Sequence, residues 1–534
     1  MLTRRQFLSY TAALGAASAF SWQTYKYLNR KPPVSINRVG LPLGHLLRDR
    51  ELLQAPPRRY ECNTLILGGG AAGLGALWYL AKHNHCDVLL AEGFERNGNN
   101  AAYTSSDGLK APSGAHYLAL PSKESVYVRE MLVDFGILQS DGSFRETDLV
   151  YAPESRLLYQ DKWVEHLLPK EDADSKRFFD LIGRLKQSYG DDGKKIFAIP
   201  IALSSADETW RKLDHLTFKQ WLDQEDYHSP ELLWYLDYCC RDDYGQGIGQ
   251  VSAFAGLHYF AARNNAETVL TWPEGLAHLS ENLRRHAGLQ EGWQWPSENI
   301  IRLEKPASVN ASAVKIKPLS DGRIEVWLRD NAKGETVAVT AQHLISAMPL
   351  MVAARIIESP EKFGLDIPEY APWLVSNFEL HSFPKEKNNS ELAWDNVVYG
   401  SQGLGYVVAT NQFIRVARPE RTIFTAYAAL NHDAPQVVRR QLLEASDEEL
   451  LQLAAQDLLT AYGEGFWRHV SHVDITVRGH GMSVPKPGYL SDEALLKIRN
   501  RNGGLLFAHS DLSSYSVFEE ALYWGVEAAR KVLA

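Results

Sequence analysis

The sequence predicts an α/β protein in which a central parallel sheet is interrupted by an inserted α+β domain. Residues 63–92 contain an apolar strand, a glycine-rich turn, a helix and a second apolar strand, which is the order of a β-α-β unit in a parallel sheet. That rhythm is lost over residues 148–265 and 350–477, where aromatic-rich helical patterns and alternating strands replace it. Apolar strands return between and after those stretches, so we expect two domains, each built from separated parts of the chain.

The turn of the β-α-β unit has glycines where a Rossmann-like dinucleotide-binding fold needs them. Gly68, Gly70 and Gly73 follow the first strand in G-x-G-x-x-G spacing. In such a unit the first glycine permits the tight turn, and the second lets a pyrophosphate approach the backbone. The third lets the helix pack closely on the strand. The sequence therefore predicts a dinucleotide site at this turn.

Two further features complete the predicted site. The helix starts at Ala71 and Ala72, where unpaired N–H groups of a helix N-terminus would bind the phosphates. The second strand ends at Glu92, which would accept hydrogen bonds from the adenosine ribose and so disfavour a 2′-phosphate. The alternative interpretation is a glycine-rich turn in an ordinary α/β core, with Glu92 as a solvated strand end.

The composition is that of a soluble globular protein. The chain has 534 residues, of which 45% are hydrophobic and 23% charged, so it is long enough for two or three domain-sized units. The net charge is −9, and the sequence contains no basic stripe with interleaved aromatic residues. Both observations argue against a nucleic-acid partner.

The cysteines predict neither a disulfide scaffold nor a metal site. The chain has only four, far too few for a disulfide framework of this length (Cys62, Cys86, Cys239 and Cys240). Cys86 lies close to two histidines, but no second group of ligands stands at zinc spacing. The segment around Cys86 is better explained as a helix end followed by a turn.

Residues 1–20 are expected to be an export signal, followed by a linker or surface arm over residues 21–60. Arg4 and Arg5 form a twin-arginine pattern ahead of a small, apolar stretch with a candidate A-x-A cleavage site. The stretch is too short to span a bilayer as a stable helix, so we expect no permanent transmembrane anchor. The pattern predicts export of the folded protein to the periplasm by the twin-arginine translocation machinery. The alternative is a chance arginine pair beside an apolar run.

Five separated stretches resemble the flavin-containing amine oxidoreductase superfamily, which comprises amine and polyamine oxidases with protoporphyrinogen-oxidase-like and phytoene-desaturase-like relatives. They are the glycine motif with its strands, the loop after it, a glycine turn, a W-P-E-G-L segment with an I-S-A-M-P segment, and the C-terminus (residues 68–92, 93–100, 113–117, 272–276 with 345–349, and 507–529). Together they span nearly the whole chain after residue 60.

The resemblance implies a glutathione-reductase-type FAD-binding domain with a central parallel sheet, built from residues 61–147, 266–349 and 478–534. It also implies that a cap or substrate domain, residues 148–265 and 350–477, is inserted between those segments. FAD is therefore the expected cofactor, and a small organic molecule is the expected substrate.

The resemblance also assigns residues to FAD. Arg96 and Gly98 lie in the loop after the ribose-binding acid, and Gly114 lies in the glycine turn beside the flavin. Asp511 would bond the ribitol or a phosphate. The C-terminal helix that begins near Val517 would direct its N-terminus at the isoalloxazine pyrimidine and stabilise negative charge on the reduced flavin. An ordinary strand and helix that close the sheet are the alternative for this segment.

Four positions depart from the pattern of the superfamily. Asn100 stands where the Arg-x-Gly-Gly-Arg loop ends in the arginine that reaches the pyrophosphate. His509 replaces the glycine of the Ala-Gly-Glu or Ala-Gly-Asp motif, and Glu520 replaces a glycine near the flavin ring. Val517 aligns with a tyrosine of the amine oxidases' aromatic cage. These changes would impair amine oxidation more than FAD binding.

The chemistry of such a protein belongs to the flavin, which takes a hydride from a substrate C–H at N5. The sequence shows no Ser-His-Asp or Cys-His arrangement for nucleophilic catalysis. Candidates for shaping the substrate pocket come from the matching stretches (His116, Tyr117, Lys486 and His509, with His480 and Tyr515). For each of them, a packed or surface polar residue is the alternative interpretation.

We expect an exported FAD-dependent oxidoreductase with an amine or polyamine as the leading substrate class. One alternative is an FAD-dependent desaturase or isomerase that acts on an apolar substrate. Another is a dinucleotide-binding protein of the same fold with little or no redox activity, which Asn100, His509 and Glu520 favour. NAD(P) in place of FAD is a further alternative, and the flavin-like C-terminal segment disfavours it.

Overall fold

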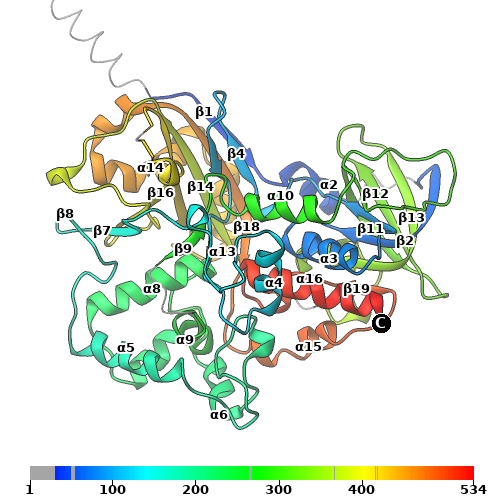
Figure 1. Ribbon diagram of the computed structural model, residues 1–534, viewed down its shortest axis with the longest axis horizontal. Coiled ribbons are helices and arrows are strands. Elements are labelled where there is room, and N and C mark those ends of the chain that lie inside the picture. The colour runs from blue at the N-terminus through cyan, green and yellow to red at the C-terminus, as the bar shows by residue number, and fades with distance from the viewer. Residues whose placement is uncertain (1–30, 50–54, 264–267, 366, 415, 418) are drawn as a thin grey trace, which may run out of the picture.

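The protein folds around two large sheets (Figure 1). A computed structural model describes the chain over residues 31–49, 55–263, 268–365, 367–414, 416–417 and 419–534. The first sheet lies at the right of Figure 1, and the second lies at the upper left with a group of helices beneath it. The expected export signal, residues 1–20, lies outside the described residues.

The first sheet contains the predicted β-α-β unit. Its strand order is β10-β3-β2-β13-β12-β11, and β19 pairs with β13. The pairs β10–β3, β3–β2, β2–β13 and β13–β19 are parallel, whereas β11, β12 and β13 form an antiparallel meander. The bounds are β2 Arg58–Leu67, β3 Val88–Ala91, β10 Ala307–Val309, β11 Ala311–Pro318, β12 Ile324–Asp330, β13 Thr336–Ser346 and β19 Leu505–Phe507.

Apolar side chains on both faces make β2 and β3 central strands. Leu65, Ile66 and Leu67 of β2 are buried, as is all of β3. Helices pack on one face of these strands, and apolar side chains of the meander pack on the other. Helix α3 (Ala71–Lys82) packs on this sheet beside α16 (Phe518–Leu533). A Cβ at Gly525 of α16 would lie 2.1 Å from Ala72 O, so the two helices are in close contact there.

The second sheet has eight strands in the order β1-β18-β14-β17-β16-β15-β7-β8. Alternation along β14 gives it two apolar faces. Leu374 and Phe378 pack against α13 and α14, whereas Trp373 and Val375 face the helical group of α5 to α9. The bounds of the strands are β1 Val34–Arg38, β7 Ser155–Tyr159, β8 Lys162–Val164, β14 Tyr370–Leu380, β15 Asp395–Val398, β16 Tyr406–Val408, β17 Thr422–Ala429 and β18 Val470–Ser483.

Two small antiparallel strand pairs and the remaining helices complete the fold. The pairs are β4–β5 (Ala102–Thr104 and Lys110–Pro112) and β6–β9 (Tyr117–Ala119 and Val269–Thr271). The helices are α2 Leu41–Asp49, α4 Val126–Asp134, α5 Ala173–Leu185, α6 Glu208–Arg211, α7 Phe218–Gln224, α8 Pro230–Tyr244, α9 Ala253–Ala261, α10 Ala277–His286, α11 Leu350–Ile356, α12 Asn411–Ile414, α13 Pro435–Glu444, α14 Asp447–Tyr462 and α15 Glu493–Arg499.

Part of the segment expected to be a linker or surface arm, residues 21–60, belongs to the fold. Its residues Val34–Arg38 form β1, which pairs in parallel with β18, and residue 58 begins β2. The expected boundary at residues 477 and 478 falls inside β18. Sequence patterns show where a strand lies but not which distant strand it pairs with, so these two assignments needed the structure.

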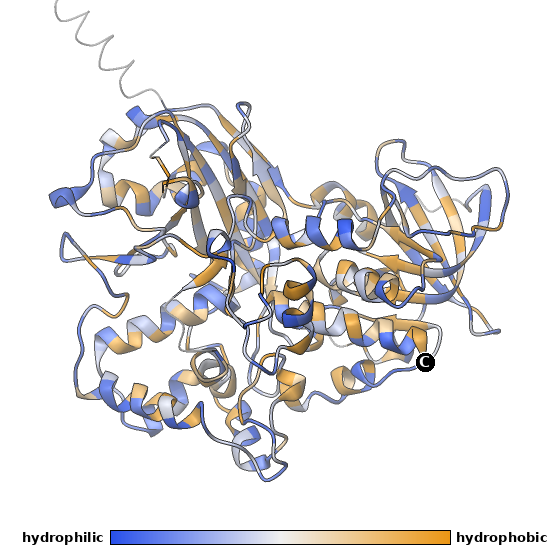
Figure 2. Cartoon of the chain, viewed as in Figure 1, coloured by the Kyte–Doolittle hydropathy of each residue, from blue (hydrophilic) through white to orange (hydrophobic). Residues whose placement is uncertain are grey.

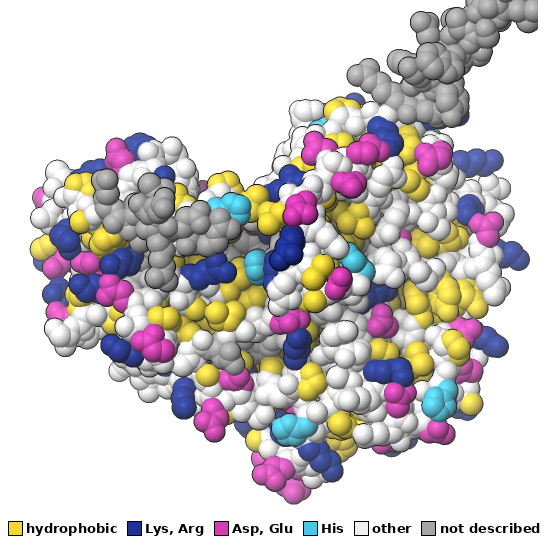
Figure 3. Space-filling model, turned by 180° about the vertical axis from the view of Figure 1, so that it is seen from behind, with side chains coloured by type: hydrophobic (Ala, Val, Ile, Leu, Met, Phe, Trp, Pro, Cys, Tyr) yellow, Lys and Arg dark blue, Asp and Glu magenta, His cyan; other side chains and the backbone are white. Residues whose placement is uncertain are grey.

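The surface shows mixed polarity. Hydrophobic residues line one side of many helices and polar residues the other (Figure 2). On the face opposite that of Figure 1, Lys and Arg side chains are interspersed with Asp and Glu (Figure 3). Within the described part of the chain, no helix has the length and hydropathy needed to cross a membrane.

Candidate cofactor and substrate site

The glycine turn after β2 has the backbone geometry of a phosphate-binding turn. Gly68 has a φ of +106°, and a Cβ there would lie 3.0 Å from Ala347 O. A Cβ at Gly73 would lie 1.9 Å from Gly68 O, so only glycine fits where α3 meets β2. A Cβ at Gly70 would meet only Asn97 O, at 4.0 Å. The space beside Gly70 is therefore open to a ligand.

The first turn of α3 presents donors to that open space. Gly70 is the N-cap in an extended conformation, no described side chain caps the helix, and its first turn holds no acidic residue. The N–H groups of Ala71 and Ala72 therefore have no partner within the helix, and the positive end of the helix dipole lies beside them. This arrangement fits a diphosphate, which is the group that the sequence motif predicts at this turn.

Glu92 places its carboxylate beside the glycine turn, where Arg284 of α10 binds it. Glu92 Oε1 and Oε2 accept hydrogen bonds from Arg284 Nη1 and Nη2 at 2.5 and 2.7 Å. Arg284 Nε donates to Asn97 Oδ1 at 3.0 Å. The Arg284 side chain is 3% exposed and that of Glu92 14%. The acid predicted to bind ribose therefore has a cationic partner that no sequence motif indicated.

The loop after β3 is bound to the same helix. Arg96 donates to both carboxylate oxygens of Glu281, at 2.8 and 2.7 Å, and to Glu291 at 2.9 Å. Asn100, which replaces the arginine expected there, is buried and donates to Ser280 Oγ at 3.1 Å. Arg96 and Asn100 therefore bind side chains of α10, and these bonds do not direct them at the glycine turn.

The loop passes between two glycine-rich turns. A Cβ at Gly98 would lie 3.5 Å from Gly70 Cα, and one at Gly114 would lie 2.0 Å from Asn99 O. Gly114 is therefore required for the close approach of the two backbones, whereas Gly98, with a φ of +55°, is favoured by its backbone conformation. Gly98 thus lies beside the dinucleotide fingerprint, and Gly114 lies against the loop that follows it.

Arg478 of β18 fastens this loop to the second sheet. Its Nη1 and Nη2 donate to Glu95 at 2.9 Å each, and Nη2 also donates to Ser113 O at 2.9 Å. The Arg478 side chain is buried, and a buried bidentate pair holds both partners in one orientation. The inserted domain therefore contacts the predicted cofactor site directly.

Asp511 lies in the turn after β19 with its carboxylate fully buried. Oδ2 accepts hydrogen bonds from the Tyr370 hydroxyl at 2.5 Å and from the Leu350 N–H at 2.8 Å. The Asp511 N–H donates to His509 Nδ1 at 3.1 Å. These bonds join the C-terminal turn to the start of α11, and the assignment of Asp511 to the ribitol or a phosphate stays a prediction.

Helix α16 begins after Val517, its N-cap, and carries two buried acids in its first turn. Glu520 Oε1 accepts a hydrogen bond from the Ile201 N–H, and Oε2 accepts one from Ser513 Oγ, both at 2.6 Å. Burial raises the pKa of Glu519 and that of Glu520 to about 7. The Glu520 carboxyl group is thus packed against the inserted domain.

His116 and Tyr117 lie where the chain leaves the glycine turn for the inserted domain. The His116 ring stacks on Tyr427 with 4.4 Å between ring centroids. Burial lowers the pKa of His116 to about 3, so its imidazole is neutral at physiological pH. The Tyr117 hydroxyl donates to Asp242 Oδ2 of α8 at 3.5 Å. The structure therefore brings these two predicted residues together with an acid that was not predicted.

Asp242 belongs to a group of acids from α8, β15 and α16, which we call the acidic cluster (Asp242, Asp243, Asp395 and Glu519). Burial and the charge of Asp243 raise the pKa of Asp242 to about 7, and burial and the charge of Asp242 raise the pKa of Asp395. Arg263 forms an ion pair with Asp243. Asp242 and Asp395 are not fully buried and keep some accessible surface.

Lys486 lies apart from this cluster. Its Nζ pairs with Glu369 at 2.7 Å, and its side chain is 44% exposed. Among the residues that the structure describes, no group of three or more His, Cys, Asp or Glu side chains could hold a metal ion. The candidate substrate side of the site is therefore formed by His116, Tyr117 and the acidic cluster.

Sequence reasoning missed the residues of α8, α10 and β15 that contribute to the site. Asp242 ends a helix whose other residues are largely apolar, and an acid pair at the buried end of a helix is a usable signal. Arg284 is one of two adjacent arginines in a polar helix end, and nothing in the local pattern distinguishes it from a surface residue. Asp395 gave no signal either.

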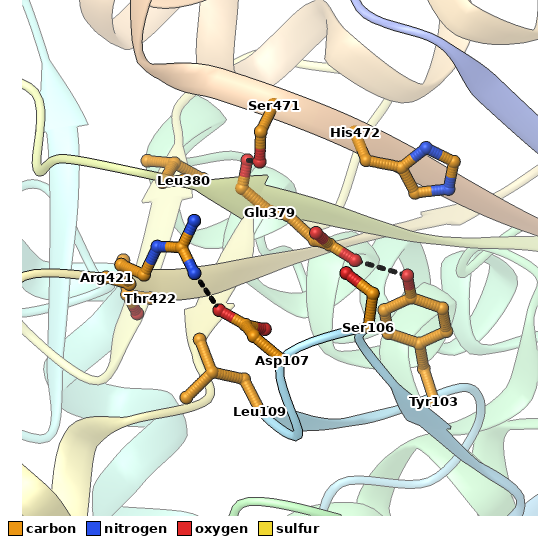
Figure 4. Close-up of a pocket in the computed structure, with 10 residues that line it drawn as sticks. All are labelled: Tyr103, Ser106, Asp107, Leu109, Glu379, Leu380, Arg421, Thr422, Ser471 and His472. Atoms are coloured by element: carbon orange, nitrogen blue, oxygen red, sulfur yellow. Dashed lines mark hydrogen bonds and ion pairs between the residues drawn. The ribbon is translucent and has the colours of Figure 1, made fainter.

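A second, open cavity of about 360 Å³ lies between the β4–β5 hairpin and strands β14, β17 and β18 (Figure 4). Within it, Tyr103 donates a hydrogen bond to Glu379, and Arg421 pairs with Asp107. None of the residues that line this cavity belongs to the predicted cofactor site. The cavity is therefore separate from the site built above.

Comparisons with known proteins agree with this geometry. The family profile of the NAD(P)-binding Rossmann-like domain matches residues 66–135. No curated protein matches the chain. A putrescine oxidase with bound putrescine has a TM-score of 0.61 and 14% sequence identity, and the alignment covers 89% of this chain and 99% of the oxidase.

Two other solved structures have the same architecture. Cyclohexylamine oxidase from Brevibacterium oxydans has a TM-score of 0.58 at 14% identity, with 88% of this chain and 98% of the oxidase covered. A fatty acid isomerase from P. acnes that produces CLA has a TM-score of 0.57 at 16% identity, with 87% and 97% covered. The protein therefore has the fold that these solved structures share, which confirms the predicted fold class.

Proposed function

We propose that the protein is an FAD-dependent oxidoreductase that acts on a cationic amine. The observation that carries this proposal is the acidic cluster, which meets His116 and Tyr117 at the border between the two domains. Its fold is one that a putrescine oxidase and a cyclohexylamine oxidase share. At 14% identity these structures show a shared fold and not a shared activity. The support for the activity therefore comes from the residues of this chain.

The residues at the glycine turn are suited to FAD. Ala71 and Ala72 would donate to the diphosphate, and Glu92 would accept from the ribose. The start of α16 at Val517 would lie at the flavin. Bound FAD would supply the hydride acceptor. The protein's own contribution is to bind these parts and to orient the substrate.

The acidic cluster favours a cationic substrate. Carboxylates that share a desolvated space repel one another, and a proton or a positive ligand relieves that repulsion. An ammonium group would also meet the aromatic faces of Tyr117 and Tyr427, which attract cations. Because burial raises the pKa of Asp242 to about 7, this carboxyl group can accept the ammonium proton near neutral pH. The substrate would then be a neutral amine, from which a hydride leaves more readily.

A second candidate function is dinucleotide binding without amine turnover. Glu519 and Glu520 stand in the first turn of α16, where the positive end of the helix was expected to stabilise reduced flavin. Ionised carboxylates at that position oppose this effect. A desaturase or isomerase that acts on an apolar substrate has less support, because an apolar occupant would leave the acidic cluster unpaired.

We also propose that the protein is exported to the periplasm by the twin-arginine route. The support is the pattern at Arg4 and Arg5 with the apolar stretch after it. Loading of a dinucleotide cofactor before export is compatible with a translocation route that carries folded proteins.

The first test is an absorbance spectrum of the purified protein before and after addition of FAD, followed by anaerobic mixing with mono- and diamines. We expect oxidised-flavin bands and their bleaching by at least one amine. A protein that takes up no flavin would contradict the proposal. Bound flavin that dithionite reduces but no amine does would favour the second candidate.

A further inference from the structure

We propose that Arg284 of α10 positions the ribose-binding carboxylate Glu92 at the adenosine end of the dinucleotide site. This inference rests on the proposed binding of an adenine dinucleotide. It assigns a role to a helix that contains no part of the glycine fingerprint.

The guanidinium of Arg284 is fully bonded and lies directly on the glycine turn. Its two terminal nitrogens donate to Glu92, and Nε donates to Asn97 Oδ1. A Cβ at Gly69 would lie 2.3 Å from Glu92 Oε2 and 3.0 Å from Arg284 Nη2. Glycine at this position therefore makes room for the ion pair, and the pair forms one wall of the turn.

No side chain of the loop after β3 is shown to bring a positive charge to Glu92. Asn100 is uncharged and binds Ser280. Arg96 binds Glu281, and its side chain is 51% exposed. Ser280, Glu281 and Arg284 lie on adjoining turns of one helix. Helix α10 thus binds the polar groups of the loop and also places the Arg284 guanidinium beside the glycine turn, where it binds Glu92.

The geometry leaves Glu92 able to bind a ribose. Each carboxylate oxygen can accept more than one hydrogen bond, and Arg284 uses one position on each. The remaining acceptor positions belong to a side chain that is 14% exposed. Without Arg284, this largely buried carboxylate would lose its counter-charge and the fixed orientation in which it accepts hydrogen bonds from ribose hydroxyls.

The test measures binding rather than turnover. The purified full-length protein is stripped of cofactor, and the dissociation constants of FAD, ADP-ribose and FMN are determined by titration calorimetry. For Arg284→Met we expect about tenfold or more weaker binding of FAD and ADP-ribose, and unchanged binding of FMN, which lacks the adenosine. Arg285→Met is the matched control, because Arg285 is the neighbouring exposed residue of the same helix, and it should bind all three ligands normally.

A double-mutant cycle separates positioning from general damage. If Arg284 acts through Glu92, the variant with both Arg284→Met and Glu92→Gln should bind ADP-ribose no more weakly than Glu92→Gln alone. Additive losses, an equal loss for FMN, or an Arg284→Met variant that binds FAD as tightly as the wild type would overturn the proposal. If Arg284→Met does not fold, Arg284→Lys replaces it, since lysine cannot form the bidentate pair, and unchanged FAD affinity would have the same meaning.

The outcomes also separate this inference from the proposed enzyme. A wild-type protein that binds ADP-ribose with the predicted dependence on Arg284, yet turns over no amine, would retain the inference and contradict the amine oxidoreductase. A wild-type protein that binds neither FAD nor ADP-ribose would overturn both.

Discussion

The Tyr117 hydroxyl lies 3.5 Å from Oδ2 of Asp242, and this contact joins the glycine turn beside the first sheet to α8 of the inserted domain. The two residues are 125 positions apart in the chain. The proposed substrate side of the site includes this contact, which makes Asp242 the first residue to test.

Asp242→Asn removes a negative charge from the acidic cluster and keeps the size of the side chain. We expect kcat/KM for amines to fall by about tenfold or more, because a hydrogen bond to a charged group is lost from a desolvated place. FAD content should stay normal. Steady-state kinetics with an amine that bleaches the wild-type flavin measures the effect, and Asp223→Asn, on the exposed surface of α7, is the control. Unchanged kcat/KM in Asp242→Asn would contradict the assignment of the acidic cluster to the substrate site.

Glu520→Gln should make stability less dependent on pH. Burial raises the pKa of Glu520 from 4.5 to about 7, so the folded state binds this proton more tightly than the unfolded state does. The free energy of unfolding therefore falls as pH rises from about 4 to about 7, by on the order of 3 kcal/mol for this group. Glutamine cannot ionise, so urea denaturation at about pH 5 and about pH 8 should give more similar values in the variant than in the wild type.

The same comparison in Glu527→Gln provides a control on the same helix, where the side chain is 25% exposed. A wild-type protein that becomes more stable between the two pH values, with no change in Glu520→Gln, would contradict the assignment. Glu519 and Asp242, whose pKa values are raised in the same direction, would leave part of the pH dependence in the variant.

Gly70→Val tests the phosphate-binding turn. A Cβ at this position meets only Asn97 O, at 4.0 Å, so the variant should fold and fail to retain flavin. Gly73→Val is the comparison, because its Cβ would lie 1.9 Å from Gly68 O and should lower the melting temperature. Flavin absorbance and thermal denaturation measure both variants. A folded Gly70→Val protein with normal flavin content would show that the dinucleotide lies elsewhere.

Replacement of Arg4 and Arg5 by lysine should keep the protein in the cytoplasm. The twin-arginine machinery reads the arginine pair as an address, so the charge alone should not suffice. Cell fractionation of a bacterial host that has this machinery measures the distribution, and Arg30→Lys controls for a lysine outside the pair. Periplasmic protein at the wild-type level would contradict this route.

The glycine fingerprint could be predicted from the sequence because each of its requirements is local. Gly68, Gly70 and Gly73 lie within six consecutive residues, and the flanking strands have the apolar runs of buried parallel strands. The departure at Asn100 is also visible in the sequence, because that position can be compared with the Arg-x-Gly-Gly-Arg loop of the superfamily. Local spacing therefore predicts the glycine turn and its two strands, and the assignment of these residues to a cofactor stays a prediction.

The rest of the site depends on pairings between distant residues that no local pattern records. Glu92 and Arg284 are 192 positions apart, and Arg478 and Glu95 are 383 apart. The members of the acidic cluster come from two helices and a strand that are distant in the sequence. Their proximity therefore becomes visible only in the folded protein. His116 and Tyr117 were predicted from a motif, but their partner Asp242 was not.

The pairing of β1 with β18 determines when the second sheet can be completed during synthesis. Among the described strands, β1 is an edge strand that pairs only with β18. It comes from the start of the described chain, at residues Val34–Arg38, whereas β18 ends at Ser483 of a 534-residue chain. A ribosome must therefore have made about nine-tenths of the protein before the strand nearest the N-terminus finds its partner. The pairing of β1 therefore comes late in synthesis, although β1 is among the first parts of the described chain to be made.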